Sequence, residues 1–118
     1  MGGALDGLRA VDFSNTLTGA HISQLLADFG ADVVLVEPPG GNQLRAQPAW
    51  PFWARGKRSV VLDLKNDDDA SAAHALATQA DVVVETWRPG VAERLGLAYD
   101  DLGQPRELGR NSVPDPAG

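Results

Sequence analysis

The residues best suited to chemistry in this sequence form a basic run, RGKR at residues 55–58, directly before an apolar segment. Guanidinium and ammonium groups in such a run can hold a phosphate through charge-assisted hydrogen bonds. Trp50 and Trp53 precede the run, and an indole face there could stack on a nucleobase. The alternatives are a solvated basic turn and two core tryptophans, because charge runs usually lie in water. A basic patch on an otherwise acidic chain suits a small anionic ligand better than a nucleic-acid duplex.

A second candidate site is the polar loop SNTLTG at residues 14–19, which follows a predicted strand and leads into a predicted helix. The loop lacks the GxGxxG pattern of ordinary dinucleotide sites, so NAD binding is disfavoured. The first backbone N–H groups of a helix can still bind a phosphate or a carboxylate. A plain turn, in which Ser or Thr caps the helix, is an equally good interpretation of these residues.

Other residue types are less suited to catalysis. The chain has no cysteine, which excludes a thiolate nucleophile, thiolate metal ligands and a disulfide framework. His21 and His74 do not have the spacing of a metal pair, so we expect structural roles for both and no bound metal. Asp12 and Glu37 end predicted strands on the side where ligands bind, yet carboxylates there often hold the following loop.

The composition is that of a single acidic globular domain. With 118 residues, of which 43% are hydrophobic and 22% charged, the chain can bury one modest core. The formal charge of −6 argues against a general nucleic-acid binder. The amino terminus lacks a basic flank and an apolar signal core, and no apolar run approaches the roughly 20 residues of a spanning helix. We therefore expect a cytoplasmic protein that is not embedded in a membrane and does not bind nucleic acid.

Hydrophobic periodicity predicts alternating strands and helices. Strands are expected at residues 8–13, 33–36, 59–64 and 81–85, helices at 20–29 and 67–79, and a short helix at 91–95. The apolar residues at helical spacing in the first helix are expected to face the core, namely Ile22, Leu25, Leu26 and Phe29. Residues 38–57 should form a long loop, and residues 103–118 an irregular or disordered tail. Over residues 1–102 this order indicates an α/β fold, a Rossmann-like parallel sheet with flanking helices.

Three ordered runs in the sequence are more specific than any single motif. They are LDGLRAVDFSNTLTGAHISQLLADFGADVVLVEPPGGNQLR at residues 5–45, RGKRSVVLDLK at 55–65 and ADVVVETWRPGVAERLGLAYDDL at 80–102. Together they resemble the amino-terminal part of the family III CoA-transferases, the group that includes formyl-CoA transferase, carnitine CoA-transferase and α-methylacyl-CoA racemase. The resemblance implies a CoA-binding Rossmann-like domain that is incomplete relative to the family, with CoA or an acyl-CoA as substrate and no metal.

The resemblance also assigns contacts to CoA. The residues so assigned are Thr16, Leu17, Thr18, Lys57, Arg58, Thr86, Trp87 and Arg94. The first three would approach the thiol arm and the substrate, and the two cations of the basic run would meet the phosphates. Thr86 and Trp87 would flank the nucleotide or the pantetheine, and Arg94 would add a further cation. Many relatives have Gly-Pro where this chain has Gly19-Ala20, and Asn where it has Thr86.

In that family an aspartate further along the chain attacks the acyl-CoA thioester and forms a mixed anhydride, which divides one acyl exchange into two easier steps. Asp100, Asp101 and Asp115 do not match the motif of that aspartate. We therefore expect the catalytic part to be missing, through truncation or a change of reading frame near Gly103. The chain alone should be inactive and should at most bind CoA.

Two other interpretations stay open. The chain could be the assembly module of a split CoA-transferase or racemase, docking with a separate carboxyl-terminal part or with copies of itself, because an unfinished sheet exposes a strand edge and apolar surface. An unrelated Rossmann-like binder of another nucleotide would explain the periodicity but not the three ordered runs. His21 is similar to a histidine of some racemase-type relatives, so the transferase and racemase branches both stay open.

Overall fold

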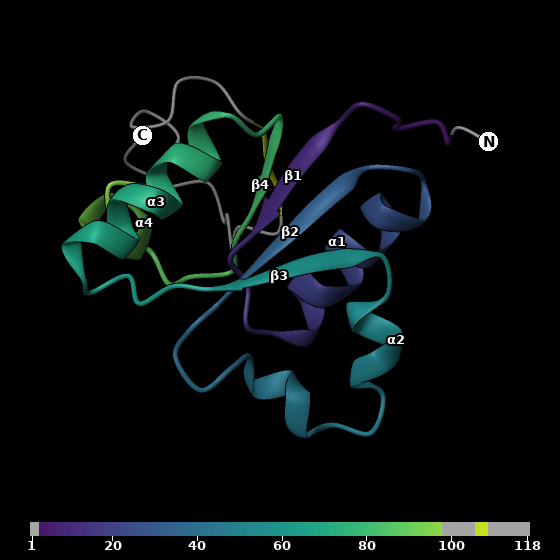
Figure 1. The fold of residues 1–118 in the computed structure, drawn as a ribbon, viewed down its shortest axis with the longest axis horizontal. Helices are drawn as coiled ribbons and strands as arrows, with labels where there is room; N and C mark the ends of the chain where they lie inside the picture. Colours follow the sequence, from purple (N-terminus) through teal and green to yellow (C-terminus); the bar gives the residue numbers. More distant parts are fainter. Residues whose placement is uncertain (1–2, 98–105, 109–118) are drawn as a thin grey trace.

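Five parallel strands form the centre of the computed structural model, which describes residues 3–97 and 106–108. The strands are β1 (Arg9–Asp12), β2 (Asp32–Glu37), β3 (Lys57–Val61), β4 (Val82–Val84) and β5 (Arg106–Leu108). Their order in the sheet is β3-β2-β1-β4-β5 (Figure 1). The chain order reverses between β1 and β4, which pair with Val11 opposite Val83. Doubly wound folds bind ligands at such a reversal, beyond the carboxyl ends of the strands.

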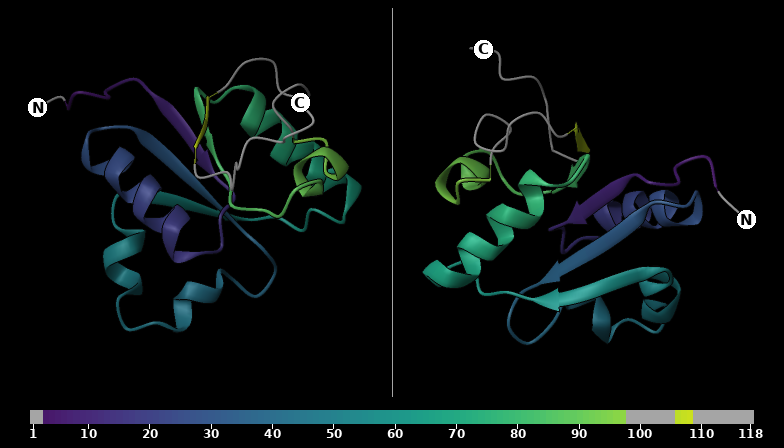
Figure 2. Two further views of the ribbon diagram at one scale, coloured as in Figure 1. Left: turned by 180° about the vertical axis from the view of Figure 1, so that it is seen from behind. Right: turned by 45° about the horizontal axis from the view of Figure 1, so that its top comes forward.

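Helices cover both faces of the sheet. On one side lie α1 (Leu17–Asp28) and the short α2 (Trp50–Ala54), and on the other lie α3 (Asp67–Thr78) and α4 (Val91–Arg94) (Figures 1 and 2). This arrangement confirms the predicted α/β fold, a Rossmann-like parallel sheet with flanking helices. In the described part of the chain, no helix is both long enough and apolar enough to cross a membrane.

The strand side chains alternate between two cores, because successive residues of a strand point to opposite faces. Val33 and Val84 belong to the core under α1. Val11 and Val83 belong to the core under α3 and α4, where Ala77 of α3 is fully buried. Since both faces of β2 and β4 are covered, the four residues between Asp32 and Glu37 and all three residues of β4 are apolar rather than alternating, as is usual in parallel sheets.

α1 begins at Leu17, three residues before the predicted start. Thr16 precedes it in extended conformation, and its Oγ1 accepts a hydrogen bond from the Gly19 N–H at 3.3 Å. A hydroxyl at this position satisfies one of the backbone donors that the first helical turn leaves without a partner. The end of the predicted helix is confirmed, because Gly30 follows it with a φ of 104°, a conformation that favours glycine.

The predicted inward face of α1 is wrong in part. Ile22 and Leu26 pack against the core, but Leu25 and Phe29 are 58% and 49% exposed. The fully buried side of the helix consists of small or polar residues, namely Gly19, Ala20, Ser23 and Gln24. Small residues are needed there because the helix approaches the loop after β1 so closely that a Cβ on Gly19 would lie 1.9 Å from the Ser14 Oγ.

Residues 38–57, predicted as a long loop, contain the 3₁₀-helix η1 (Gln43–Ala46) and α2. The Asn42 side chain caps η1 by accepting a hydrogen bond from the Leu44 N–H at 2.8 Å. Pro51 lies in the first turn of α2, where its missing N–H costs nothing. Both helices are too short to show a hydrophobic period, so the periodicity did not reveal them.

Most other predicted boundaries differ by a single residue, but β3 and β5 differ by more. β3 covers Lys57–Val61 instead of residues 59–64. β5 falls within residues 103–118, which were predicted to be irregular, and it pairs with β4 in parallel register. Without β5, the backbone N–H and C=O groups on this edge of β4 would have no partner in the sheet. Pairing with β5 provides hydrogen bonds for these groups, and backbone pairing does not depend on apolar side chains. The other residues of the predicted tail lie outside the described residues.

We predict that Gly19→Ala lowers the free energy of unfolding by roughly 2 kcal/mol, because the added methyl group overpacks the contact with Ser14. Urea denaturation at neutral pH measures the change. The control is Thr18→Ala at the exposed neighbouring position, which should change the midpoint little. Equal stability of the two variants would contradict the close approach.

Candidate functional site

A cavity of about 870 Å³ lies beyond the carboxyl ends of the strands. Its walls come from the segments that follow β1, β2, β3 and β4 and from α4. The lining residues are Phe13, Asn15, Val36, Glu37, Pro38, Pro39, Leu62, Asp63, Leu64, Lys65, Trp87, Val91, Arg94 and Leu95. A concave, largely apolar cavity with a few polar groups at this edge of a parallel sheet is the usual place for a ligand.

Carboxylates at or just after the strand ends shape the walls of this cavity. Asp12 accepts a hydrogen bond from the Ser14 N–H at 2.7 Å, and Glu85 accepts one from the Trp87 N–H at 2.9 Å. Asp63, which follows β3, accepts one from the Lys65 N–H at 3.0 Å. Each carboxylate thereby turns the chain sharply within two residues.

Glu37 carries the most extensive of these networks, and its side chain is fully buried. Arg45 donates to it from Nε at 2.6 Å and from a terminal nitrogen at 2.7 Å, and the Asn42 N–H donates at 2.8 Å. The Ser59 hydroxyl also donates to it. The Arg45 guanidinium is the main reason that the pKa of Glu37 falls from 4.5 to about 2. These bonds hold residues 38–45 against the sheet, as expected for a strand-end carboxylate.

Asp12 is equally buried but lies in a different environment. Besides the Ser14 N–H it accepts a hydrogen bond from the Ser23 hydroxyl at 2.5 Å. Burial raises the pKa of Asp12 above its usual value, while these hydrogen bonds and the charge of Lys57 act in the opposite direction. Asp12 therefore connects the end of β1 to α1 and is turned away from the cavity lining.

The predicted phosphate ligands are separated by the structure. Lys57 and Arg58 are neighbours on β3, so their side chains point to opposite faces of the sheet. The Lys57 ammonium donates to the Ala20 carbonyl at 3.2 Å, and burial lowers its pKa. Arg58 pairs with Asp32, at 2.5 Å, near the amino ends of the strands. Neither residue lines the cavity, and their predicted contacts with CoA stay untested.

The cations that do line the cavity are Arg94 and Lys65. Arg94 was among the predicted site residues, and its side chain comes from α4. Lys65 was not among the residues predicted from the sequence, because the denser cluster of cations at residues 55–58 was chosen as the phosphate site instead. The available signal was its place at the end of the run RGKRSVVLDLK, just after a predicted strand, where the carboxyl ends of parallel strands meet.

The predicted threonines meet where the strand order reverses. Thr16 follows β1, Thr86 follows β4, and their Oγ1 atoms lie 3.0 Å apart. Trp87 packs on Phe13 with ring centroids 5.3 Å apart, and both rings line the cavity. Leu17 and Thr18 are exposed in the first turn of α1 beside this junction. The structure thus brings Thr16, Thr86 and Trp87 together at one end of the sheet.

The other aromatic and histidine candidates lie elsewhere. Trp50 lies under the Arg45 guanidinium, 4.8 Å from it, and Trp53 faces His21 with ring centroids 6.3 Å apart. Neither indole lines the cavity, so the stacking role considered for them has no support in this geometry. Among residues 3–97 and 106–108, no group of three or more His, Asp or Glu side chains could hold a metal ion.

The fold and the cavity define a doubly wound α/β protein with a ligand site at the carboxyl edge of its sheet. Comparison with known proteins narrows this class: the sequence profile of CoA-transferase family III matches residues 5–106. The chain therefore belongs to the family III CoA-transferases. This confirms the family that the three ordered runs indicated.

Characterised relatives agree with this assignment. The chain is 43% identical over 115 residues to succinyl-CoA:mesaconate CoA-transferase of Haloarcula hispanica, with 85% of this chain and 28% of that protein aligned. It is 42% identical over 109 residues to the probable fatty acyl-CoA transferase Rv3272 of Mycobacterium tuberculosis, with 83% and 28% aligned. The chain thus spans less than a third of the length of these relatives.

Solved structures show the same fold. The crystal structure of Rv3272 from M. tuberculosis superimposes with a TM-score of 0.77 at 44% identity, covering 85% of this chain and 28% of that one. A CAIB/BAIF family protein from Brucella suis superimposes with a TM-score of 0.78 at 32% identity, covering 86% and 30%. This α/β fold is therefore a shared part of larger proteins.

We predict that acid destabilises this protein partly through Glu37. A carboxylate whose pKa is lower in the folded state stabilises that state above its unfolded pKa of 4.5 and loses this contribution as the pH falls towards about 2. The contribution at neutral pH should be roughly 3 kcal/mol. Denaturation midpoints measured from pH 7 to pH 2.5 should therefore fall less steeply in Arg45→Met than in the parent chain.

The matched control is Arg55→Met, which removes an exposed ion pair with Asp28 at 3.0 Å. Exposed pairs contribute little to stability, so this variant should follow the parent chain across the pH range. If Arg45→Met and the parent chain lost stability in parallel, the depressed pKa of Glu37 would not be part of acid unfolding.

Proposed function

We propose that this chain is the CoA-binding part of a family III CoA-transferase and that its cavity holds the CoA moiety of an acyl-CoA. The observation that carries the proposal is the cavity at the carboxyl edge of the sheet, where the cations Lys65 and Arg94 lie among apolar walls, and where the carboxylates Glu37 and Asp63 are already bonded within the protein. The relatives at 36–43% identity are named for succinyl-CoA, acetyl-CoA and fatty acyl-CoA substrates, which share CoA and differ in the acyl group. CoA is common to these substrates, and we therefore assign it to the domain that is common to these proteins.

The two cations suit the phosphates of CoA. Lys65 follows β3 and Arg94 lies in α4, and both side chains line the same cavity. A phosphate accepts charge-assisted hydrogen bonds from either group. In this proposal Lys65 takes the place that the basic run was expected to fill. Lys57 instead holds the first turn of α1 through the Ala20 carbonyl.

The apolar wall suits the uncharged parts of CoA. Trp87 offers an indole surface, and Val91 of α4 and Leu95 directly after this helix also line the cavity. A flat base or a pantetheine chain gains free energy by covering such side chains. The junction of Thr16 and Thr86 lies at the reversal of strand order, and we place the thiol arm along it, with Leu17 and Thr18 towards the substrate.

The complete reaction is proposed for the whole enzyme only. In the mechanism that the family implies, an aspartate carboxylate attacks the thioester carbonyl, the CoA thiolate leaves, and a mixed anhydride remains. An acceptor carboxylate then attacks the aspartyl carbonyl of this anhydride, so that the donor acid leaves as a carboxylate and a second anhydride forms. The CoA thiolate attacks the acceptor's acyl carbonyl, the acceptor leaves as the new acyl-CoA, and the aspartate carboxylate is regenerated. The buried carboxylates Asp12 and Glu37 hold their own loops and are not placed for this attack. The chain alone should bind CoA and not turn it over.

A second role is that of an assembly module, which docks with the rest of the enzyme. Exposed apolar side chains on α1 favour this role, since a free domain rarely gathers several of them on one side. The two roles are compatible, because the cavity and this side of α1 do not share lining residues. We propose the cytoplasm as the compartment, where acyl-CoA thioesters are metabolised.

We predict that the chain binds CoA measurably by calorimetry and that Lys65→Met and Arg94→Met each weaken binding about tenfold, the loss of one charge-assisted contact. Arg58→Met is the matched control, because this cation lies at the opposite end of the sheet. Absence of binding at millimolar CoA would refute the proposal, as would a larger loss from Arg58→Met than from Lys65→Met.

A further inference from the structure

The loop after β1 is held by two residues of the loop after β2. The side-chain nitrogen of Asn42 donates a hydrogen bond to the Ser14 carbonyl at 3.1 Å. The Gln43 N–H donates to the side-chain oxygen of Asn15 at 2.7 Å, and the Gln43 side chain donates to the Asn15 carbonyl. We refer to Asn42 and Gln43 as the loop clamp. The clamp joins two segments that lie 28 residues apart in the chain.

Asn42 is built into the fold, because its side chain is 4% exposed and its polar groups are bonded in three directions. Its side-chain oxygen accepts from the Leu44 N–H at 2.8 Å, and its own N–H donates to Glu37 at 2.8 Å. Since the amide oxygen is occupied by Leu44, the amide nitrogen faces Ser14. A buried carbonyl that loses its donor costs free energy, so the position of Ser14 depends on Asn42.

The clamp acts at the point where the strand order reverses. It bonds the carbonyl groups of residues 14 and 15, and the next carbonyl, that of Thr16, accepts from the Ala20 N–H at 3.0 Å. The Thr16 hydroxyl in turn lies 3.0 Å from that of Thr86, after β4. Three successive carbonyl groups are therefore bonded, and Thr16 cannot move away from Thr86 without breaking hydrogen bonds.

The two clamped segments form only one part of the cavity wall. Asn15 lines the cavity, as do Pro38 and Pro39 just before the clamp. The cations Lys65 and Arg94 come from other segments, after β3 and in α4. Different parts of one ligand can thus meet a wall that depends on the clamp and a wall that does not.

We propose that Asn42 and Gln43 are positioning residues for the thiol arm of CoA. Neither lines the cavity, and they act by fixing the loop that carries Thr16 before the ligand arrives. The inference rests on the proposed function, which places the thiol arm along Thr16 and Thr86. A loop that is already ordered spares the ligand the cost of ordering it. The clamp therefore raises the affinity for the arm and leaves the affinity for the nucleotide unchanged.

Two variants of the 118-residue chain remove the clamp. Asn42→Ser keeps the cap of η1, because a serine hydroxyl also accepts from a helical N–H, but its side chain is too short to reach the Ser14 carbonyl. Gln43→Ala removes the donor to the Asn15 carbonyl and leaves the backbone bond of Gln43 in place.

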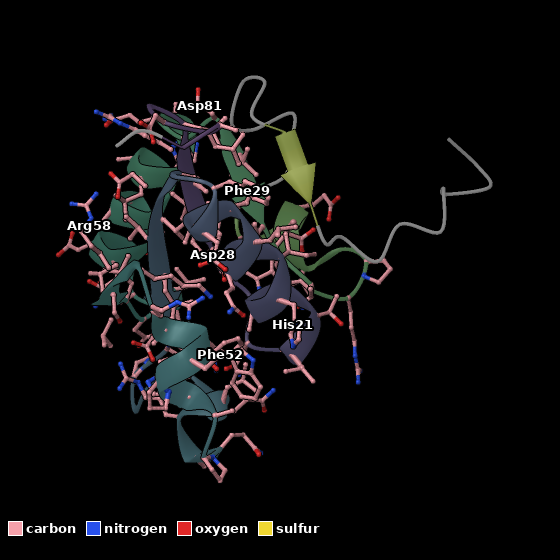
Figure 3. The ribbon with its side chains drawn as sticks, turned by 90° about the vertical axis from the view of Figure 1, so that its right-hand side faces the viewer. His21, Asp28, Phe29, Phe52, Arg58 and Asp81 are labelled. Carbon is pink, nitrogen blue, oxygen red and sulfur yellow. The ribbon has the colours of Figure 1, made fainter. Side chains whose placement is uncertain are left out.

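Two controls separate the clamp from general effects. Asp81→Ala removes a bond of the same kind, from the Arg9 N–H at 2.9 Å, between two segments at the opposite end of the sheet. Figure 3 shows this separation, with Asp81 at the top of the view and His21, near the start of α1, well below it. Val33→Ala shortens a fully buried core residue and destabilises the chain without touching either loop.

The affinities of every variant are measured by calorimetry for CoA and for adenosine 3′,5′-bisphosphate, the nucleotide part that lacks the pantetheine arm. Asn42→Ser should weaken CoA binding about tenfold and the fragment less than about twofold, because only the arm uses the loop. Gln43→Ala should give a smaller loss of the same kind. The controls should leave the ratio of the two affinities at its parent value.

Amide hydrogen exchange tests the clamp without a ligand. In Asn42→Ser the N–H groups of Gly19 and Ala20, both bonded to Thr16, should exchange faster, because the loop opens locally more often. The N–H of Val83, in the middle of β4, should keep its parent rate. In Val33→Ala any acceleration should be shared by both regions.

Four results would overturn the proposal. They are an equal loss of affinity for CoA and for the fragment in Asn42→Ser, unchanged exchange in this variant, a selective loss of CoA in Val33→Ala, and absence of CoA binding by the parent chain. The last would refute the proposed function together with this inference, whereas the first three would refute this inference alone. If Asn42→Ser does not fold, Gln43→Ala decides by the same criteria, because its side chain is exposed.

Discussion

Carboxylates at the ends of parallel strands accept hydrogen bonds from the backbone N–H groups of the loops that follow, and these bonds support the carboxyl edge of the sheet. A buried carboxylate loses the solvation of its charge, and that loss is tolerable only where donors replace water. Asp12, Glu37 and Glu85 are all buried, and each accepts at least one loop N–H at 2.7–2.9 Å. The loops therefore leave the strands in fixed directions, and these directions create the cavity.

The same constraint decides which cations can meet a ligand. A side chain reaches the cavity only if its backbone leaves the sheet at the carboxyl edge. Lys65 meets this condition, because Asp63 turns the chain after β3. Lys57 and Arg58 enter the sheet at the amino end of the same strand, and parallel pairing with β2 keeps them there. A cluster of charged residues in the sequence therefore does not show which charged side chains will line a cavity.

The chain spans less than a third of the length of its relatives, and the shared fold is one part of those larger proteins. Near its start α1 buries small or polar residues, because the helix lies close to the loop after β1. Ile22 and Leu26 also pack against the core, whereas Leu25 and Phe29 are exposed.

The sequence by itself determined the α/β class, the parallel sheet, the order of its elements and the family, because apolar periods, glycine stops and three ordered runs are local properties of the chain. It also indicated that Asp12 and Glu37 could hold loops. Only the tertiary structure decided that Leu25 and Phe29 face outwards, that residues 43–46 and 50–54 are helical and that residues 106–108 pair with β4. It alone placed Lys65 with Arg94 in one cavity and separated both from Arg58. The physical reason is that the hydrophobic period of a segment shows which of its residues share a face. What packs on that face, and at which end of the sheet a charged side chain lies, depends on contacts between segments far apart in the chain.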